Sequence, residues 1–397
     1  MTTTSSEAML RVLHATLNME LDAELELGIE LRHRAHAEPC LSGEEGPASA
    51  LLARYLPGEP EPVAGTGFSL RVGPAQGVSI GIRTELDALP IVEETGAEFA
   101  ASNGAMHACG HDVHQAAFVT FLRAASRVDL PVGILGIAQP REETYPSGAK
   151  DVVDSDLFER HDVARMLGVH VHPGLPAGKV STGAGGINAS ADEFLVRIDG
   201  RGGHGAYPHT AVDPVPVAAR TTLALYEILR STIDPVNTAT LTIGQLVAGS
   251  AANVIPDTAE IRGTVRAMTP ADREALHEGI GRVSTHQAAS AGATAQVLVT
   301  RGEPVLFNDP ALVADLDPWI IRSGIGIVEP LRSCGADDFS FFTERLPGVM
   351  AFLGVECQVA GQQPPLHSST FLPVDETVDQ VARLFAAMYV GAVAGLA

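Results

Sequence analysis

The stretch HDVHQAAFVTFLRAASRVDLPVGILGIAQP, residues 111–140, decides the fold class. Its apolar residues over 111–128 have the spacing of an amphipathic helix, and PVGILGIAQP is typical of a short apolar strand. Strand-like stretches precede it at 77–90 and follow it at 164–172. Strands that alternate with helices predict a mostly parallel sheet covered by helices on both faces.

A different order of elements begins near Ala189. Strands are expected at 192–200, 238–249, 258–268 and 294–302, with one helix at 213–231 and another opened by Thr269 and Pro270. This βαββαβ order is the ferredoxin-like pattern. We therefore expect an α/β fold with a discontinuous domain of mixed, mostly parallel sheet, residues 1–188 and 302–397, and an inserted α+β ferredoxin-like domain, residues 189–301.

Size and composition narrow the class of protein. A chain of 397 residues is long for a single core, which favours two domains. The net charge of −22 repels phosphate backbones and anionic lipids, so we expect neither nucleic acid nor a membrane as partner. No apolar run of about 18 residues and no signal-peptide pattern is visible, which predicts a soluble, cytoplasmic protein. Complete phosphate-loop, dinucleotide-binding and serine-hydrolase motifs are also missing.

The motif MHACGHDVH, residues 106–114, brings a thiol and imidazoles close together. Cys109 and His111 are too close in sequence to share one helical face, so a loop at the entrance of the helix should present both. Glu142 and Glu143 follow the next apolar strand. Because adjacent side chains diverge, one of these carboxylates can bind a metal while the other faces a substrate water.

Two more histidines extend this set. His170 and His367 would complete a shell of nitrogen, oxygen and sulfur donors that zinc, cobalt, nickel or manganese accepts, and five ligands make two ions plausible. Each residue alone has an ordinary explanation, such as a buried thiol or solvated glutamates. Their shared place at strand ends, near Asp87, favours a metal site. His204, in a glycine-rich turn, could equally be a capping residue.

Seven motifs in sequence order carry a family resemblance: MHACGHDVH, QPREE, GVHVHPGLPAG, GGHGAYPHTAVDP, NVIPDTAEIRGTVR, DDFSFF and LHSSTF. Together they resemble the metal-dependent aminoacylase and carboxypeptidase superfamily. Within it the chain looks most like the amidohydrolases that cleave N-acyl amino acids, including hippurate hydrolase and the indole-acetyl-amino-acid hydrolases. The resemblance implies a catalytic domain interrupted by a lid that also forms homodimers.

The resemblance also implies a role for each matching residue. The ligands of two divalent transition metal ions would be Cys109, His111, Glu143, His170 and His367. Glu142 would be the general base and His204 would polarise the scissile carbonyl, in some relatives from the partner subunit. Asn253 and Arg266 would line the substrate site, and Asp87 and Asp112 would support the ligands from behind. The products would be a carboxylic acid and a free amino acid.

Some positions depart from the family pattern. Glu85 stands where relatives commonly have aspartate, and Asp337 stands where a glutamate is usual. Neither change removes a ligand, but both bear on turnover and substrate preference. Two alternatives therefore remain beside the aminoacylase: a dipeptidase or carboxypeptidase of the same superfamily, and a non-catalytic protein that binds acylated amino acids.

Overall fold

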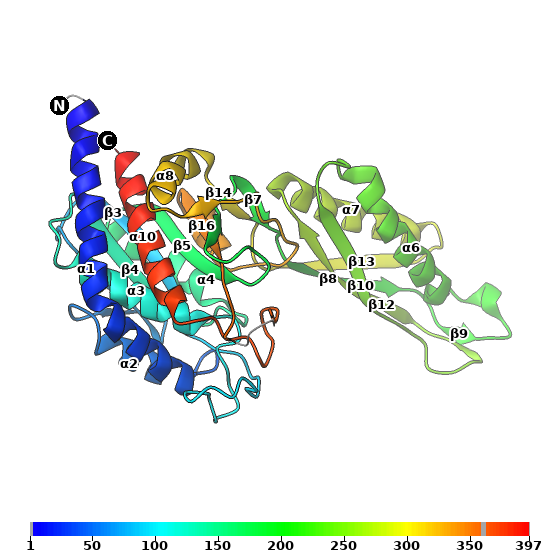
Figure 1. Ribbon diagram of the computed structural model, residues 1–397. Helices are drawn as coiled ribbons and strands as arrows, with labels where there is room; N and C mark the ends of the chain where they lie inside the picture. Colours follow the sequence, from blue (N-terminus) through cyan, green and yellow to red (C-terminus); the bar gives the residue numbers. More distant parts are fainter. Residues whose placement is uncertain (1–2, 359–362, 397) are drawn as a thin grey trace. The chain divides into compact units, whose positions relative to one another are not determined.

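Residues 111–140 form a helix and then a strand in the computed structural model, which describes residues 3–358 and 363–396 (Figure 1). The strand lies inside an eight-stranded sheet with the order β1-β2-β4-β3-β5-β16-β6-β15. The central strands β4, β3, β5 and β16 are mutually parallel. The β1–β2, β2–β4 and β16–β6 pairs are antiparallel. The predicted mixed α/β fold is thereby confirmed.

The elements around this sheet have the following bounds. The strands are β1 Glu61–Val63, β2 Gly67–Val72, β3 Ser79–Glu85, β4 Gly133–Gln139, β5 Val163–His172, β6 Lys179–Ser181, β15 Gly326–Ile327 and β16 Gly348–Gly354. The helices are α1 Thr3–Ala37, α2 Gly46–Ala53, α3 His111–Ala125, α4 Gly148–Val153, α5 Leu157–Arg160, α8 Pro310–Arg322, α9 Ser340–Arg345 and α10 Glu376–Ala394.

Helix α3 departs from the amphipathic helix that the sequence predicts. Every residue of α3 except Arg123 is buried. The reason is that α1 and α10 both pack on α3 and on each other, while α3 also contacts β3 (Figure 1). The polar residues of α3 therefore face protein rather than solvent, and each of them needs a partner inside the core.

Along the sequence, the elements with the ferredoxin-like order lie between the two groups of strands that form the large sheet. A four-stranded antiparallel sheet has the order β10-β12-β8-β13. Its elements are β8 Asp192–Asp199, α6 Pro214–Thr232, β10 Ala239–Ala248, β12 Thr258–Ala267, α7 Pro270–Ala289 and β13 Thr294–Arg301. Short elements accompany them: β7 Gly185–Asn188, β9 Gly203–His204, η1 Pro208–Thr210, β11 Val254–Ile255 and β14 Leu306–Asn308.

Local sequence explains where the two helices of this smaller sheet begin. Asp213 caps α6 by accepting a hydrogen bond from the N–H of Val215 at 2.9 Å, and Thr269 caps α7 by accepting from Asp272 at 3.1 Å. A proline follows each capping residue, where its missing N–H costs no hydrogen bond. The helices then cover one face of the sheet and share an apolar core with it.

Contacts divide the chain into two units. The larger comprises Met1–Gly185, Phe307–Leu331 and Phe341–Ala397, and the smaller comprises Gly186–Leu306 and Arg332–Ser340. Each unit has a hydrophobic core of its own. Among the described helices, none combines the length and the apolar character that crossing a membrane requires.

Candidate metal centre

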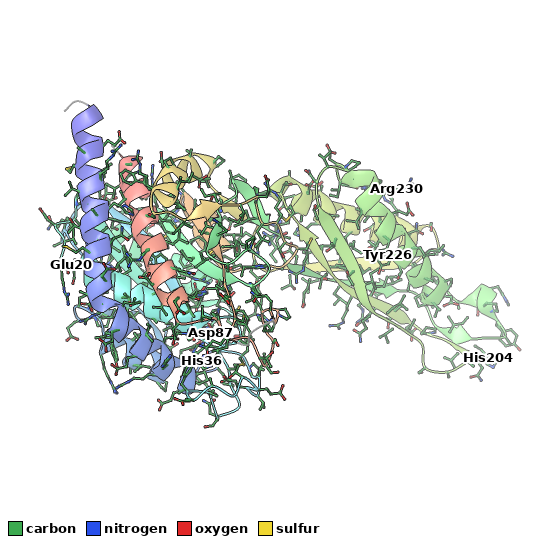
Figure 2. The ribbon with its side chains drawn as sticks, in the orientation of Figure 1. Glu20, His36, Asp87, His204, Tyr226 and Arg230 are labelled. Carbon is green, nitrogen blue, oxygen red and sulfur yellow. The ribbon has the colours of Figure 1, made fainter. Side chains whose placement is uncertain are left out.

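The side chains that the sequence singles out in the larger unit lie on segments at one edge of its sheet. Strands β3, β4 and β5 run parallel, so their carboxyl ends share this edge. Asp87 follows β3, Glu142 and Glu143 follow β4, and His170 lies near the end of β5. Figure 2 labels Asp87 in this unit.

A thiol, two imidazoles and a carboxylate converge there. The Sγ atom of Cys109 lies 3.4 Å from Nε2 of His170. One donor atom each from Cys109, His111 and Glu143 lie within 4.8 Å of one another. Cys109, His111 and His170 are buried, and Glu143 is partly buried. Sulfur, nitrogen and oxygen donors at this spacing suit zinc and similar transition metals.

Both imidazoles turn the same nitrogen toward this centre. Nδ1 of His111 lies 2.9 Å from the carbonyl oxygen of Asp87, and Nδ1 of His170 lies 2.7 Å from that of Val171. A carbonyl oxygen can only accept, so each Nδ1 carries the proton and each Nε2 keeps its lone pair. Metal-binding histidines typically make this kind of second hydrogen bond, which fixes the ring and its tautomer.

Two buried polar atoms without a hydrogen-bond partner are also consistent with a metal site. Within residues 3–358 and 363–396, Nε2 of His111 and Oε1 of Glu143 are buried and have no hydrogen-bond partner. Buried polar atoms normally have one, and a bound cation would satisfy both. Burial holds the pKa of His170 well below its usual range, which keeps this ring neutral, and it raises the pKa of Glu143. A cation bound beside Glu143 would favour its charged form.

His367 reaches the centre from the C-terminal part of the chain. Its backbone N–H donates to the carbonyl oxygen of Ala108 at 2.8 Å, which ties this loop to the residue before Cys109. Its Nε2 lies 3.6 Å from Oε1 of Glu143. His367 has a φ of 65°, a left-handed conformation that side chains adopt at a cost and that is common at functional sites.

The carboxylates of Glu142 and Glu143 diverge. Oε2 of Glu142 lies 3.7 Å from Nε2 of His111. Oε1 of Glu143 lies 3.6 Å from Nε2 of His367, and a carboxylate oxygen of Glu143 lies within 4.8 Å of donor atoms of Cys109 and His111. The N–H of Glu143 donates to Oδ2 of Asp87 at 2.9 Å, which anchors the backbone between the two carboxylates. One carboxylate can thus hold a metal while the other stays available for proton transfer.

Asp87 and Asp112 have different surroundings. Asp87 touches the centre twice, through its carbonyl oxygen to His111 and through its carboxylate to the N–H of Glu143. The carboxylate of Asp112 instead faces α1, where it accepts from Nε of Arg32 and lies near Nδ1 of His36, each at 3.0 Å. Asp112 therefore anchors the start of α3 and does not touch a proposed ligand through these bonds.

The partners of these buried groups are not among the residues predicted from the sequence. Arg32 and His36 lie one turn apart on α1 and are buried among apolar residues. A charged residue on the apolar face of a helix was the available signal. His114 and Arg83 were missed as well: His114 contacts Glu85, and Arg83 pairs with the same carboxylate.

His204, Asn253 and Arg266 lie in the smaller unit. His204 pairs with Val254 on β11, and the N–H of Gly205 donates to the carbonyl oxygen of Asn253 at 2.8 Å, so His204 and Asn253 are neighbours. They lie beyond the Thr258 end of β12. Arg266 lies near the opposite end of that strand, eight residues or roughly 26 Å from Thr258. One chain therefore does not bring His204 and Arg266 together.

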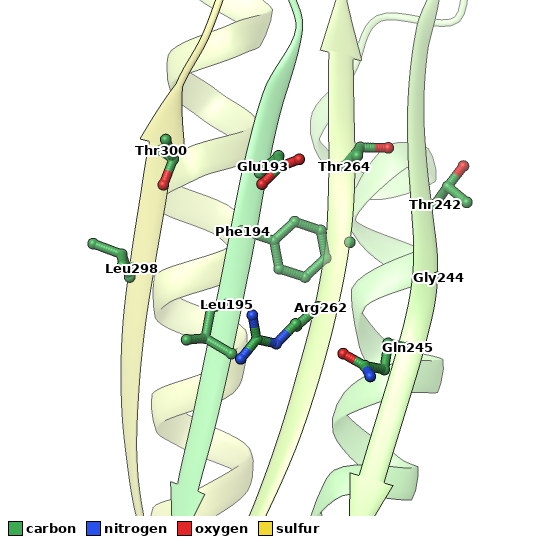
Figure 3. A pocket seen from close by; sticks show the side chains of 11 residues that line it. Glu193, Phe194, Leu195, Thr242, Gly244, Gln245, Arg262, Thr264, Leu298 and Thr300 are labelled. Carbon is green, nitrogen blue, oxygen red and sulfur yellow. The ribbon is translucent and has the colours of Figure 1, made fainter. Parts of the chain in front are cut away.

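A shallow hollow on the smaller unit is not a metal centre. It lies on the sheet face that α6 and α7 leave open, and Figure 3 shows side chains of four strands around it. Its lining is mixed: Thr242, Thr264, Thr300 and Arg262 share it with Leu195 and Leu298. The lining contains one carboxylate, Glu193, and no histidine or cysteine.

The mixed sheet and its cluster of side chains that could hold a metal ion fit a metal-dependent hydrolase. Comparison with known proteins agrees: residues 81–390 match the family described as Peptidase family M20/M25/M40, and the chain belongs to this family. The sequence-based prediction of the metal-dependent aminoacylase and carboxypeptidase superfamily is confirmed, as is the prediction of an enzyme that acts on amide bonds.

Three similar proteins illustrate the range of the family. The N-acetyl-L-cysteine deacetylase of Bacillus subtilis is 32% identical over 83% of this chain and 80% of its own. Thermostable carboxypeptidase 2 of Saccharolobus solfataricus is 33% identical over 90% of this chain and 92% of its own. The crystal structure of a dinuclear metal-binding M20 peptidase of B. subtilis, 29% identical, has a TM-score of 0.81 and covers 93% of this chain and 98% of its own.

Proposed function

We propose that the protein hydrolyses the amide bond of N-acyl amino acids to a carboxylic acid and a free amino acid. The observation that carries this proposal is the centre of Cys109, His111 and Glu143 with a separate carboxylate, Glu142, beside it. The similarity to a deacetylase of an N-acetyl amino acid over most of both chains points to the same class of substrate.

Two divalent metal ions, zinc, manganese, cobalt or nickel, would be held in this centre. The proposed ligands are Cys109, His111, Glu143, His170 and His367. When bound, such ions polarise a carbonyl oxygen and lower the pKa of a water molecule towards neutrality. Asp87 would keep His111 and Glu143 in place through its carbonyl oxygen and its carboxylate.

Glu142 would be the proton carrier of the reaction. Its carboxylate takes the proton of the attacking water as the oxygen reaches the amide carbon. The same carboxylate then returns the proton to the amide nitrogen, so that the amino acid leaves as a neutral amine. A side chain that acts as base and then as acid in this way is typical of general acid–base catalysis.

His204 would stabilise the negative charge on the carbonyl oxygen. Its Nδ1 lies 3.1 Å from the N–H of Ala206 and accepts from it, so the neutral ring carries its proton on Nε2. Nε2–H is then a donor for the developing oxyanion. Asn253, which neighbours His204, and Arg266 would contact the substrate.

We propose a homodimer formed through the smaller domain, residues 189–301, which would also act as the lid. Because His204 and Arg266 lie at opposite ends of one sheet, a site that uses both would take them from two subunits. The proposal is also supported by exposed apolar side chains on α6, which contacts the edge strand β10: Leu223 is 71% and Tyr226 is 44% exposed. The cytoplasm is the proposed location, and the absence of disulfides among the four cysteines fits a reducing compartment.

A carboxypeptidase is the second candidate, because a carboxypeptidase relative matches this chain over nine tenths of both sequences. Both candidates use the same centre and release an amino acid, and they differ in the acyl group on the carbonyl side of the amide.

The test is a chelation and restoration assay. The purified protein is stripped with a chelator, reloaded with Zn²⁺, Mn²⁺, Co²⁺ or Ni²⁺, and assayed for free amine release. The substrates are acetyl, benzoyl and indole-acetyl amino acids, with dipeptides and carboxypeptidase substrates as the comparison panel. We expect chelator-sensitive hydrolysis that is fastest on N-acyl amino acids. Faster hydrolysis of the peptides would favour the carboxypeptidase, and no hydrolysis of either panel would contradict an enzyme.

A further inference from the structure

We propose that His114, Glu85 and Arg83 form a chain of hydrogen bonds that positions the ligand His170, and that His114 is not itself a ligand. The inference rests on the proposed metal centre, because His170 is one of its five ligands. It assigns a role to three buried residues that the proposed reaction does not use.

The hydrogen bonds of His114 fix its tautomer. Its Nε2 lies 3.0 Å from the backbone nitrogen of Val171, and its Nδ1 lies 3.0 Å from Oε2 of Glu85. A backbone N–H can only donate, so Nε2 accepts and the proton of the neutral ring is on Nδ1. This Nδ1–H donates to Glu85. Both ring nitrogens are therefore engaged, and neither has a lone pair for a metal.

Val171 connects His114 to the centre. Its N–H donates to His114, and its carbonyl oxygen accepts from Nδ1 of His170 at 2.7 Å. The two rings meet edge to face, with centroids 4.7 Å apart and planes inclined by 67°. Both the N–H and the carbonyl oxygen of Val171 are thus hydrogen-bonded. Its carbonyl oxygen keeps Nε2 of His170 directed at Sγ of Cys109, 3.4 Å away.

Glu85 anchors the end of this chain of hydrogen bonds that lies farthest from His170. It closes β3, and Arg83 lies two residues earlier on the same side of that strand and pairs with Oε1 of Glu85. Nε of Arg83 also donates to Gln139 at 2.8 Å on the neighbouring strand. Burial alone would raise the pKa of Glu85, but Arg83 together with the imidazoles of His114 and His111 outweighs burial and holds that pKa well below its usual range. The carboxylate is therefore a charged acceptor inside the core.

A second interpretation is that His114 and Glu85 are themselves metal ligands. Donor atoms of Glu85, His111, His114 and His170 lie within 4.8 Å of one another, so the four could in principle hold a metal. The bond from the N–H of Val171 argues against this use of His114, because a metal at Nε2 would displace a buried backbone donor. The two interpretations predict different Co²⁺ content in a protein without His114: weaker binding of one ion if His114 positions His170, and complete loss of one ion if His114 is a ligand.

The test measures Co²⁺ binding, which needs no substrate. Metal-free protein is titrated with Co²⁺ in competition with a chelator, and the visible absorption of bound Co²⁺ is followed. We expect Glu85→Gln and His114→Ala each to weaken the binding of one Co²⁺ by about tenfold to a hundredfold, since partners of metal-binding histidines have effects of this size. Glu24→Gln is the matched control, because Glu24 is also buried and paired with arginines, Arg123 and Arg127. We expect it to bind Co²⁺ like the wild type.

Two further variants separate positioning from general damage. The double variant Glu85→Gln/His114→Ala should bind Co²⁺ no more weakly than the weaker-binding single variant, because the two residues act through one chain of hydrogen bonds. His114→Gln, whose side-chain oxygen can accept from Val171, should recover part of the loss. Circular dichroism of the metal-free proteins checks folding, and Glu85→Asp, which keeps the charge but loses reach, replaces Glu85→Gln if the latter does not fold.

Wild-type Co²⁺ affinity in Glu85→Gln, or additive losses in the double variant, would overturn the proposal. Complete loss of one Co²⁺ in His114→Ala, equal to that in His170→Ala, would make His114 a ligand and would also overturn it. A wild-type protein that binds two Co²⁺ but hydrolyses no amide would contradict the proposed function and leave the positioning chain standing.

Discussion

Glu142 and Glu143 are adjacent in sequence, yet Glu143 shares a group of donor atoms with Cys109 and His111, whereas Glu142 lies beside that group, 3.7 Å from His111. At the scale of single residues this difference would separate proton transfer from metal binding. A change at one carboxylate should therefore affect catalysis and a change at the other should affect metal content.

Glu142→Gln keeps the size and shape of the side chain but removes the base. We expect kcat to fall by a factor of about 10² to 10⁴ while the metal content stays at the wild-type value. Steady-state assays on an N-acyl amino acid, with metal analysis of the same sample, measure both. In Glu143→Gln, both kcat and the metal content should fall. A wild-type rate in Glu142→Gln would show that another group moves the proton.

Gly110 is required by the backbone between Cys109 and His111. Its φ is +86°, and a Cβ atom there would lie 2.5 Å from Cγ2 of Val171. We expect Gly110→Ala to lower the free energy of unfolding by about 2–4 kcal/mol, from the left-handed backbone and the overlap together. Gly104→Ala is the control, because Gly104 has a φ of +85° with no atom within 4 Å of the added Cβ. Urea unfolding should show a loss of only about 1 kcal/mol there. Equal losses would exclude the overlap as a cause.

The sequence predicted the residue types of the centre but not the groups behind them. Cys109 and His111 stand out because thiol and imidazole groups share a short loop. Arg32 and His36 could not be assigned a role, because their partner Asp112 is distant in sequence and only the packing of α1 on α3 brings them together. The role of Val171 depends on two backbone hydrogen bonds that no side-chain pattern encodes.

At the scale of elements, α1 and α3 are joined by a buried charged cluster. His36 has a carboxylate at each ring nitrogen: Asp112 at Nδ1 and Glu93 at Nε2, both at 3.0 Å. Burial opposes the charge on this ring, but the two carboxylates outweigh it and raise the pKa of His36 to about 9. The folded protein therefore binds this proton more tightly than the unfolded chain, in which the pKa is about 6.5.

This difference predicts how stability depends on pH. Because the folded pKa is the higher one, the contribution is complete below pH 6.5 and is lost as the pH rises through about 9. We expect the free energy of unfolding to fall by the order of 3 kcal/mol over this window. Urea unfolding of metal-free protein between pH 6 and pH 10 measures the slope, and His36→Gln should remove it. An unchanged slope in His36→Gln would assign the effect to other groups.

Periodicity predicted the elements well and their burial less well. The alternation of strands and helices around residues 111–140 predicted the mixed sheet correctly. The apolar spacing of α3 predicted an amphipathic helix, but α1 and α10 cover its outer side. Contacts with helices from the two ends of the chain are not visible in the local pattern of α3, which is why the sequence did not predict the burial of its polar residues.

At the scale of the whole molecule, the smaller unit has the features of an independent domain. Its helices α6 and α7 and its four-stranded sheet enclose a separate core that includes Val196, Leu225 and Ile280. An independent core is the main requirement for a domain to fold alone.

We therefore expect a fragment of residues 186–306 to fold on its own. It should unfold in one cooperative thermal transition, form dimers in analytical ultracentrifugation and bind no Co²⁺, since it contains none of the five proposed ligands. The full chain, studied at the same concentration, is the control and should also be dimeric. A folded but monomeric fragment would contradict dimerisation through this domain, and an unfolded fragment would contradict its independence.

The central claim is that Cys109, His111, Glu143, His170 and His367 together hold two metal ions. Anomalous diffraction from crystals grown with Zn²⁺, recorded at the zinc absorption edge, tests this claim most directly. We predict two anomalous peaks per chain among these five side chains, with one peak about 2.3 Å from Sγ of Cys109. Absence of a peak near Cys109, or His170 and His367 lying too far apart to share the centre, would contradict the account.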